Sequence, residues 1–312
     1  MALRSLVTGG AGFIGNHLVK ALVEKGHEVV VLDNLQRGNK LDKDVFQAVE
    51  FIEGDVRNYE TVLAATARCD SVFHLAAVLG VDIVADNPVE TMETEVIGLR
   101  NVANSCLRNA IGMLCYASTS GVYGKAAIET AVGEEFEVSP NSSYSIAKRY
   151  NEIYLKALFQ EKRQPSVSIR YFNVYGPKQD QRMVIPRFFE QAMQGNPLTV
   201  FGSGGQTRDF TYVDDVVRAT ILLSEKSRGC EIVNISHGHE INIFDLAHKI
   251  KNLCGSSSPV ALIDQPKGRY DFEVERRVGN SSKLRAIIGD WSSIDLDTGL
   301  ARIWEGYDGA RK

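Results

Sequence analysis

The sequence lacks the features that mark secreted, zinc-binding and nucleic-acid-binding proteins. Its five cysteines are odd in number, scattered along 312 residues and without a Cys-x-x-Cys pair. This pattern predicts a reducing compartment, with no disulfide framework and no structural zinc. The formal net charge is −4, which argues against a general nucleic-acid binder because such proteins carry a basic surface.

Long apolar segments are also missing. No stretch approaches the roughly 20 apolar residues that a membrane-spanning helix needs. The N-terminus passes directly into strand-like sequence, so we expect no signal peptide. His237 and His239 have no third ligand nearby, so we expect no metal site. These absences predict a cytoplasmic protein without a membrane partner. The length of 312 residues is sufficient for one or two domains with a large core.

What the sequence does contain is a glycine-rich junction between a short apolar strand and an amphipathic helix. The predicted strand covers residues 3–7 and the helix starts at Phe13, with Gly9, Gly12 and Gly15 between and just beyond them. Such a junction lets the backbone approach a pyrophosphate, whose charge is attracted by the N–H groups at the helix start. Glycines also mark ordinary tight turns, so the rest of the chain must supply the context.

Short β-branched runs alternate with helical stretches through the first half of the chain. This alternation implies right-handed βαβ units and a parallel sheet covered by helices. Ligands bind such sheets beyond the carboxyl ends of the strands. The predicted strands are 3–7, 28–32, 49–52, 71–75, 113–117 and 167–171, and the predicted helices are 13–26, 59–67, 88–109 and 143–159.

The pattern becomes less regular after Gly176-Pro177. We therefore predict an α/β protein, a Rossmann-type doubly wound parallel sheet with a smaller C-terminal α/β substrate lobe. The dinucleotide-binding domain is expected over 1–175, with 209–237 returning to it, and the substrate lobe over 176–208 and 238–312. Helices are predicted over 183–195, 213–224, 243–253 and 281–288, and strands over 198–201 and 231–235.

Asp33 ends the second predicted strand, where a carboxylate can bind a ribose 2′-hydroxyl and repel a 2′-phosphate. This favours NAD over NADP, although Arg37 keeps NADP as an alternative. An aspartate at this place can also simply cap a turn. Asp55 and Val56 follow the third strand, where they would lie near the adenine.

Two further sets of residues carry groups suited to proton transfer. Tyr144 and Lys148 are four residues apart on a predicted helix and so share a face. An ammonium beside a phenol favours the phenolate, which can act as a base. The segment 117–124 after a strand carries hydroxyls that would bridge a substrate alcohol and Tyr144. Each set also has an ordinary explanation, a chance Tyr–Lys pair and a polar loop bound to its own backbone.

Together these motifs resemble the extended short-chain dehydrogenase/reductases of the nucleotide-sugar epimerase/dehydratase group, UDP-hexose 4-epimerases in particular. The resemblance covers almost the whole chain. The matching segments are Thr8–Gly15, Leu32–Asn34, Gly54–Val56, His74–Ala77, Ser118–Ser120, Val122–Gly124, Tyr144 with Lys148, Arg170–Pro177, Pro197–Gly202 and Gln206–Asp215.

The resemblance implies a tightly bound NAD+, a UDP-sugar substrate and a homodimer formed through helices 88–109 and 143–159. By analogy, Tyr144 takes the proton of the sugar 4-hydroxyl, and Lys148 holds the nicotinamide ribose and lowers the pKa of Tyr144. Thr119 and its neighbour Ser120 complete the catalytic set. The expected cofactor residues are Gly9, Gly12, Phe13, Ile14, Gly15, Asp33, Asn34, Asp55, Val56, Leu75, Ala76, Ala77, Tyr144, Lys148 and Tyr171.

The same resemblance implies residues for the nucleotide-sugar. Arginine suits the diphosphate because its planar fork pairs with phosphate oxygens, and spacing alone leaves Arg276 and Arg277 as equal alternatives. The expected substrate residues are Thr119, Asn173, Val200, Arg208 and Arg277.

The reactions of this group share hydride transfer from the sugar C4 to NAD+ and differ in the next step. In the 4,6-dehydratases the catalytic threonine is followed by Asp and then Glu, whereas in this chain Thr119 is followed by Ser120 and Gly121. Nucleotide-glucuronate decarboxylases carry a Glu at the position of Gly121. Epimerisation needs no such group, because the ketone rotates and the hydride returns to its other face. We predict a UDP-hexose, hexosamine or uronate 4-epimerase. The alternatives are an NDP-hexose or hexosamine 5,6- or 4,6-dehydratase and a catalytically silent NAD-binding scaffold.

Two features depart from the group's pattern. Glu95 stands where the group usually has an asparagine that supports the geometry of the active-site helix. Residues 78–86 differ from a typical epimerase loop and lie where the sugar is expected. Both departures suit a specialised sugar-modifying enzyme, for instance a 5,6-dehydratase acting through the same 4-keto intermediate.

Overall fold

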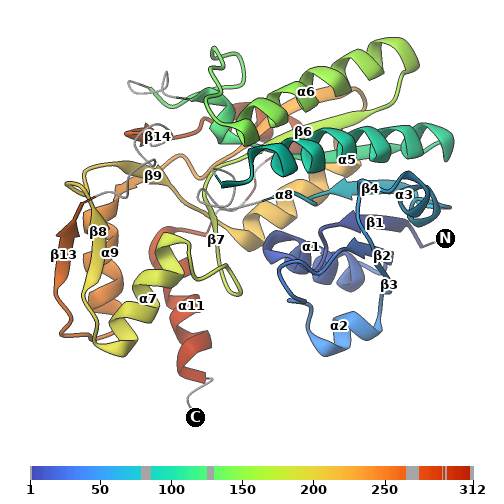
Figure 1. Ribbon diagram of the computed structural model, residues 1–312. Coiled ribbons are helices and arrows are strands. Elements are labelled where there is room, and N and C mark those ends of the chain that lie inside the picture. Colours follow the sequence, from blue (N-terminus) through green and yellow to red (C-terminus); the bar gives the residue numbers. More distant parts are fainter. Residues whose placement is uncertain are drawn as a thin grey trace.

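A seven-stranded parallel sheet forms the centre of the molecule (Figure 1). The computed structural model describes residues 2–78, 86–124, 130–264, 274–289, 291 and 294–309. The strand order is β11-β6-β5-β4-β1-β2-β3, so the chain reverses its direction of travel across the sheet between β1 and β4. This is the doubly wound arrangement, and the predicted fold class is confirmed.

Each predicted strand of the sheet is present, with its ends shifted by no more than a few residues. β2, for example, is a near-continuous run of apolar residues, because both faces of the sheet are covered. The strands are β1 (Arg4–Thr8), β2 (Glu28–Asp33), β3 (Glu50–Glu53), β4 (Ser71–His74), β5 (Met113–Thr119), β6 (Ser166–Tyr171) and β11 (Cys230–Ile235).

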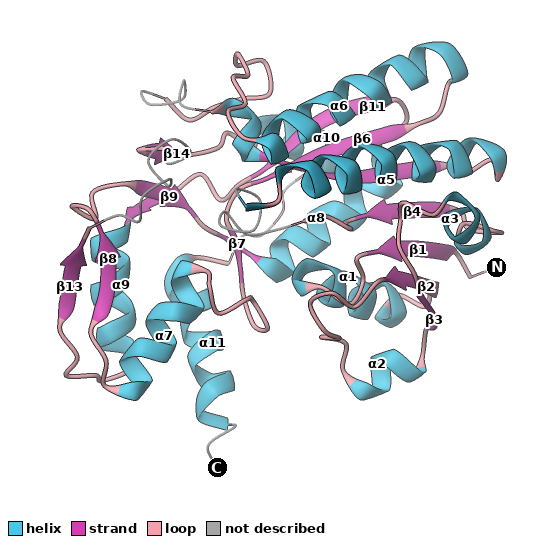
Figure 2. Ribbon diagram, in the orientation of Figure 1, coloured by secondary structure: helices cyan, strands magenta, loops and turns pink. Residues whose placement is uncertain are grey.

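Helices cover the sheet on both faces, and each face has its own apolar core (Figure 2). One core contains Leu18, Val216 and Leu284, from the first set of helices, and the other contains Val62, Leu99 and Leu155, from the second set. The first set is α1 (Phe13–Glu24), α8 (Val213–Lys226) and α10 (Ser282–Ile288), and the second is α3 (Tyr59–Ala65), α5 (Pro88–Arg108) and α6 (Ser143–Lys162). A short helix, α2 (Lys43–Gln47), precedes β3.

Other segments from the second half of the chain build a smaller lobe around a third apolar core. Phe189 lies in this core and stacks on Trp304 at 6.1 Å between ring centroids. No helix in the described part of the chain is both long and apolar enough to cross a membrane. The helices of the lobe are α7 (Val184–Gln194), α9 (Ile243–Leu253) and α11 (Leu296–Gly309), and β8 (Leu198–Phe201) pairs with β13 (Val260–Ile263).

Several short strands at the junction of the lobes were not predicted, because two to four residues carry no periodic pattern. β12 (Glu240–Asn242), β9 (Thr207–Asp209) and β14 (Arg276–Arg277) form one small sheet. β7 (Val174–Tyr175) and β10 (Thr211–Tyr212) form another. The 3-10 helix η1 (Ser120–Tyr123) follows β5 directly.

The turn between β1 and α1 depends on an unusually close approach of two backbone segments. A Cβ atom on Gly15 would lie 2.1 Å from the carbonyl oxygen of Gly9. Gly9 itself has a φ of +70°, and its Cβ would lie 2.7 Å from the Ala76 nitrogen. A Cβ on Gly12 would lie 3.2 Å from the same Gly9 oxygen, a tight contact that a small shift of the backbone would relieve. Gly9 and Gly15 are therefore required by the fold itself.

We expect Gly15→Ala to lower the free energy of unfolding by about 1–3 kcal/mol, or more, because the new methyl group forces the turn apart. Gly306→Ala is the matched control, since Gly306 lies in α11 with nothing within 4 Å of the added atom. Alanine there should be neutral or should stabilise by about 0.5–1 kcal/mol. Urea unfolding measures both, and equal stabilities of the two variants would refute the close approach.

Candidate active site

A cavity of about 660 Å³ lies beyond the carboxyl ends of the strands and extends to α6 and α7. All the residues predicted to contact the cofactor line it. Thr119, Ser120, Asn173 and Arg277 line it as well. The structure thus brings together residues that are far apart in the sequence.

One end of the cavity has the shape and the donors that a dinucleotide needs. Helix α1 begins at this end, and its N-cap residue Gly12 provides no side-chain cap for the first N–H groups. Asp33 at the end of β2 accepts hydrogen bonds from the Ala11 nitrogen at 3.0 Å and the Leu35 nitrogen at 2.9 Å. Burial raises the pKa of Asp33, and these bonds oppose the rise. Uncapped N–H groups suit a pyrophosphate, and the carboxylate suits a ribose hydroxyl.

Beside this end, residues 37–40 are joined to residues 178–180 by hydrogen bonds and an ion pair. The sequence did not predict these contacts. Lys40 donates to the Lys178 carbonyl at 2.9 Å, and Lys178 donates to the Lys40 carbonyl at 2.8 Å. Arg37 pairs with Asp180 at 3.1 Å. These contacts join residues about 140 positions apart, so no local pattern could have indicated them.

The other end of the cavity carries the predicted proton-transfer groups. Tyr144 and Lys148 lie on the first two turns of α6, and the Lys148 Nζ atom is 5.3 Å from the centroid of the Tyr144 ring. Thr119 ends β5, and its hydroxyl accepts a hydrogen bond from the Gly121 nitrogen at 3.0 Å. Ser142 caps α6 in a capping box with Ser145, which fixes where the helix begins and hence where Tyr144 lies.

The pKa of Tyr144 is raised, which is the opposite of the predicted lowering by Lys148. The first cause is burial, and the second is the negative charge of Glu95. Glu95 Oε2 lies 2.8 Å from Lys148 Nζ, and both side chains are buried. The carboxylate therefore offsets the ammonium that was expected to favour the phenolate. The one signal in the sequence was the departure from asparagine at this position.

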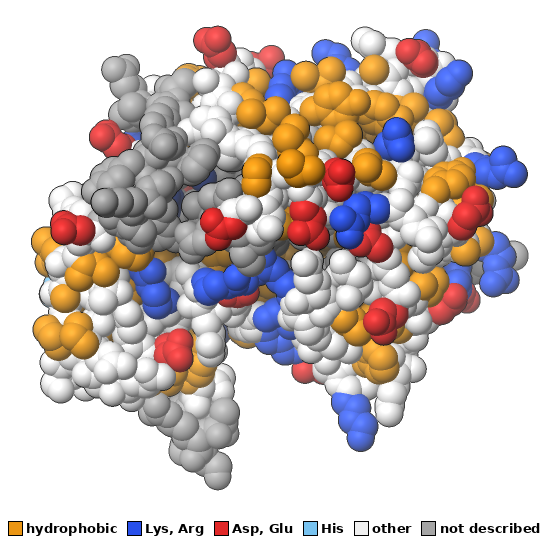
Figure 3. All heavy atoms as spheres, viewed as in Figure 1, with side chains coloured by type: hydrophobic (Ala, Val, Ile, Leu, Met, Phe, Trp, Pro, Cys, Tyr) orange, Lys and Arg blue, Asp and Glu red, His pale blue; other side chains and the backbone are white. Residues whose placement is uncertain are grey.

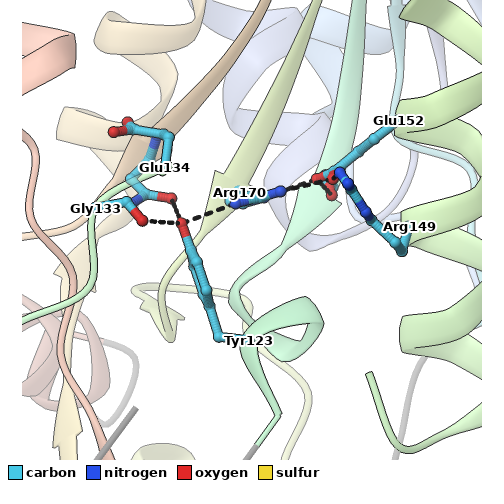
Figure 4. Close-up of polar contacts among 8 residues, drawn as sticks. Tyr123, Gly133, Glu134, Arg149, Glu152 and Arg170 are labelled. Atoms are coloured by element: carbon cyan, nitrogen blue, oxygen red, sulfur yellow. Dashed lines mark hydrogen bonds and ion pairs between the residues drawn. The ribbon is translucent and has the colours of Figure 1, made fainter. Parts of the chain in front are cut away.

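A second buried ion pair fixes α6 against the sheet, as Figure 4 shows. Arg170 on β6 donates two hydrogen bonds to Glu152 on α6, at 2.8 Å and 2.7 Å. Ser118 on β5 donates to the same carboxylate at 2.6 Å. Burial alone would raise the pKa of Glu152, but the bonds from Arg170 bring it below its usual value. Arg170 also donates to the hydroxyl of Tyr123 at 2.9 Å.

The structure separates the two arginines that spacing could not distinguish. Arg276 forms an ion pair with Glu240, with nitrogen–oxygen distances of 3.0 Å and 2.8 Å. Arg277 lines the cavity. Arg208 is the register partner of Arg277 on β9, but it is not among the residues that line the cavity. Arg277 is therefore the better candidate for the diphosphate.

The remaining substrate predictions have different outcomes. Asn173 lines the cavity, and its side-chain nitrogen donates to the Asp209 carbonyl at 3.1 Å. Val200 is fully buried in the core of the smaller lobe and does not line the cavity, because its side chain on β8 points into that core.

Residues 79–85 of the unusual loop lie outside the described residues, whereas Val78 lines the cavity. The described residues contain no group of three acidic, histidine or cysteine side chains that could hold a metal ion.

Comparison with known proteins adds independent information. A family model described as the NAD dependent epimerase/dehydratase family matches residues 5–236. The chain is 34% identical over 310 residues to a UDP-N-acetyl-alpha-D-glucosaminuronate decarboxylase of Bacillus cytotoxicus, with 96% of each chain covered. It is 34% identical over 304 residues to a putative UDP-glucose 4-epimerase of Methanocaldococcus jannaschii, again with 96% of each covered.

A solved structure extends the similarity to three dimensions. The UDP-glucose 4-epimerase of Thermotoga maritima, crystallised with UDP-glucose, superposes with a TM-score of 0.92 at 31% identity. The superposition covers 99% of this chain and 100% of that chain. The similarity therefore extends over nearly the whole chain and includes both lobes.

We expect Arg170→Ala to lower the free energy of unfolding by about 3–5 kcal/mol, because it removes the main partner of a buried carboxylate. Arg149→Ala is the matched control. Arg149 binds the same carboxylate at 3.0 Å, but its side chain is 31% exposed, so its loss should cost about 1 kcal/mol or less. Chemical denaturation checks both values, and similar losses in the two variants would contradict the assignment.

Proposed function

The chain belongs to the NAD-dependent epimerase/dehydratase family, and from this premise we propose that it is a UDP-sugar 4-epimerase acting through a 4-keto intermediate. The family assignment makes NAD its cofactor and a nucleotide-sugar modification its class of reaction. Relatives at the same 34% identity have names that belong to two reactions, decarboxylation and epimerisation. The choice between the reactions must therefore come from the residues around the reacting carbon.

The residues of the cavity have distinct roles in this proposal. The start of α1 at Gly12 holds the pyrophosphate, and Asp33 holds the adenosine ribose. Bound at this place, NAD would supply the hydride acceptor for oxidation of the sugar C4 and the hydride donor for its reduction. Tyr144 takes the proton of the sugar 4-hydroxyl, and Thr119 holds that hydroxyl by a hydrogen bond. Lys148 keeps one donor free for the nicotinamide ribose, since its other two bind Glu95 and Ala117.

The observation that carries the proposal is the absence of a second acid or base beside Thr119 in the described part of the cavity lining. Gly121 has no side chain, and a Cβ there would already meet the Thr119 hydroxyl at 3.3 Å. Four carboxylates line the described part of the cavity. Each of them contacts, or acts electrostatically on, a residue at the end of the cavity where the adenosine is expected. Asp33 binds the glycine turn, Asp55 binds Arg57, Asp180 binds Arg37, and Glu90 acts electrostatically on Arg57.

Elimination of water requires a base at C5 and an acid at the departing hydroxyl, so these residues favour epimerisation. A 4-keto sugar can rotate in the cavity and take the hydride back on its other face without any further group. Tyr144 alone then serves both directions, as a base in the first step and as an acid in the second.

The test is incubation of the NAD-loaded protein with UDP-glucose, UDP-N-acetylglucosamine and UDP-glucuronate, followed by mass spectrometry and NMR. We expect the mass of at least one of these sugars to stay unchanged while its C4 configuration inverts. Tyr144→Phe should reduce turnover by about 10²–10⁴-fold while the amount of bound NAD stays the same. Loss of water or of carbon dioxide would make the protein a lyase, and no change in any sugar would support an NAD-binding scaffold.

We also propose that the protein is a cytoplasmic homodimer. All five cysteines are free, which supports a reducing compartment. Hydrophobic side chains gather over α5 and α6 (Figure 3). These two helices pack against each other, and their outer faces carry exposed apolar residues at helical spacing, which supports a four-helix contact between two copies. The residues are Val89, Met92, Ile146, Tyr150 and Ile153.

Ile153→Glu should convert the dimer into a monomer, because it buries a charge without a partner in the contact. Leu262→Glu is the control, since Leu262 is equally exposed, 55% against 53%, but lies on β13 in the smaller lobe. Light scattering after gel filtration distinguishes the two masses. A parent protein that runs as a monomer, or a dimer that Ile153→Glu leaves intact, would exclude this contact.

A further inference from the structure

Glu95 gives the lysine of the active site a buried anionic partner. Both side chains are at most 1% exposed, and Glu95 Oε2 lies 2.8 Å from Lys148 Nζ. The ammonium also donates to the Ala117 carbonyl at 2.8 Å. The carboxylate comes from α5, the ammonium from α6 and the carbonyl from β5, so three elements meet at this one charge.

The other titratable groups around the pair are neutral or have partners of their own. Tyr116 on β5 has its hydroxyl 3.5 Å from the carboxylate and its ring centroid 4.8 Å from the ammonium, and burial raises its pKa. Burial lowers the pKa of His74 on β4 to about 3, so this imidazole is uncharged at physiological pH. Glu152 on α6 is bound to Arg170 on β6. Glu95 is thus the carboxylate that acts on the ammonium.

Stability alone does not explain this ion pair. Removing two charges from water offsets most of the attraction between them. The second carboxylate oxygen, Oε1 of Glu95, is also buried without a hydrogen-bond partner, which is a further cost. A neutral side chain at residue 95 would leave the buried ammonium of Lys148 without a counter-charge, so the role of the carboxylate is to neutralise that charge.

Tyr144 is the group on which the pair acts. Its ring centroid is 5.3 Å from Lys148 Nζ. Burial raises the pKa of this phenol, and the charge of Glu95 raises it further. An unpaired ammonium at this distance would favour the phenolate. With the carboxylate beside it, the ammonium exerts a much weaker field, and the phenol keeps its proton.

We propose that Glu95 is a positioning residue that cancels the charge of Lys148, so that Tyr144 ionises only beside the positive charge of oxidised NAD. Tyr144 then takes the proton of the sugar 4-hydroxyl, forming its own O–H bond as the hydride leaves C4 and the C=O bond of the ketone forms. The phenol keeps that proton until the hydride returns, when the proton goes back to the sugar oxygen. This inference rests on the base role proposed for Tyr144, and it holds for every product considered above.

The test is a titration of tyrosinate absorbance in the protein loaded with NAD+ or with NADH and without sugar. Subtracting the same protein carrying Tyr144→Phe isolates the signal of Tyr144. In the parent, this signal should appear at lower pH with NAD+ than with NADH. In Glu95→Gln, it should appear lower by about one pH unit or more in both cofactor states, because the field of Lys148 is no longer cancelled.

Glu93→Gln is the matched control, because Glu93 lies on the same helix but is exposed, and it should titrate as the parent does. If Glu95→Gln shows no cooperative melting, Glu95→Asn takes its place. An unshifted titration in a folded, NAD-loaded Glu95 variant would overturn the proposal, as would equal titrations of the parent in the two cofactor states. The titration contains no sugar, so a negative product assay leaves its result unaffected.

Discussion

Two buried ion pairs on successive turns of α6 hold this helix in place beside the cavity. Lys148 binds the Ala117 carbonyl and Glu95, and one turn later Glu152 binds Ser118 and Arg170. Because Ala117 and Ser118 are neighbours on β5, the helix is attached to consecutive residues of one strand. A shift of the helix by one turn would leave buried charges without partners, at a cost of several kcal/mol for each ion. This constraint sets where Tyr144 lies relative to Thr119.

The stability of the fold comes from elsewhere. The apolar cores on the two faces of the sheet and the third core of the smaller lobe bury the aliphatic side chains that drive folding. Buried ion pairs add little net stability compared with apolar residues of the same size. The molecule therefore uses its cores for stability and its buried charges for position, and the charges occur where the position of a phenol and a hydroxyl matters.

The parts of the structure that depend on local residue patterns could be predicted from the sequence. The strands of the main sheet are short segments that contain apolar and β-branched residues, and the turn at Gly9–Gly15 has a fixed spacing, so both could be predicted. Contacts between distant segments could not be predicted. Glu95 and Lys148 are 53 positions apart, and nothing near either residue indicates that they meet. Burial raises the pKa of Tyr144, and the charge of Glu95 raises it further; neither cause could be predicted from the sequence around Tyr144. The choice of Arg277 over Arg276 likewise depends on Glu240, which belongs to a different short strand.

The proposed reaction constrains what Tyr144 must do. In an epimerase the proton removed from the 4-hydroxyl has to return to the same oxygen, so the base of the first step is the acid of the second. A phenol held permanently as phenolate by an unpaired ammonium would perform the first task well and the second poorly. A phenol whose ionisation follows the charge of the cofactor performs both, because its affinity for the proton rises when the hydride arrives. The proposed pairing of Lys148 with Glu95 accounts for that behaviour, and among the described residues beside Thr119, Gly121 has no side chain that could act on the ketone as an acid or a base.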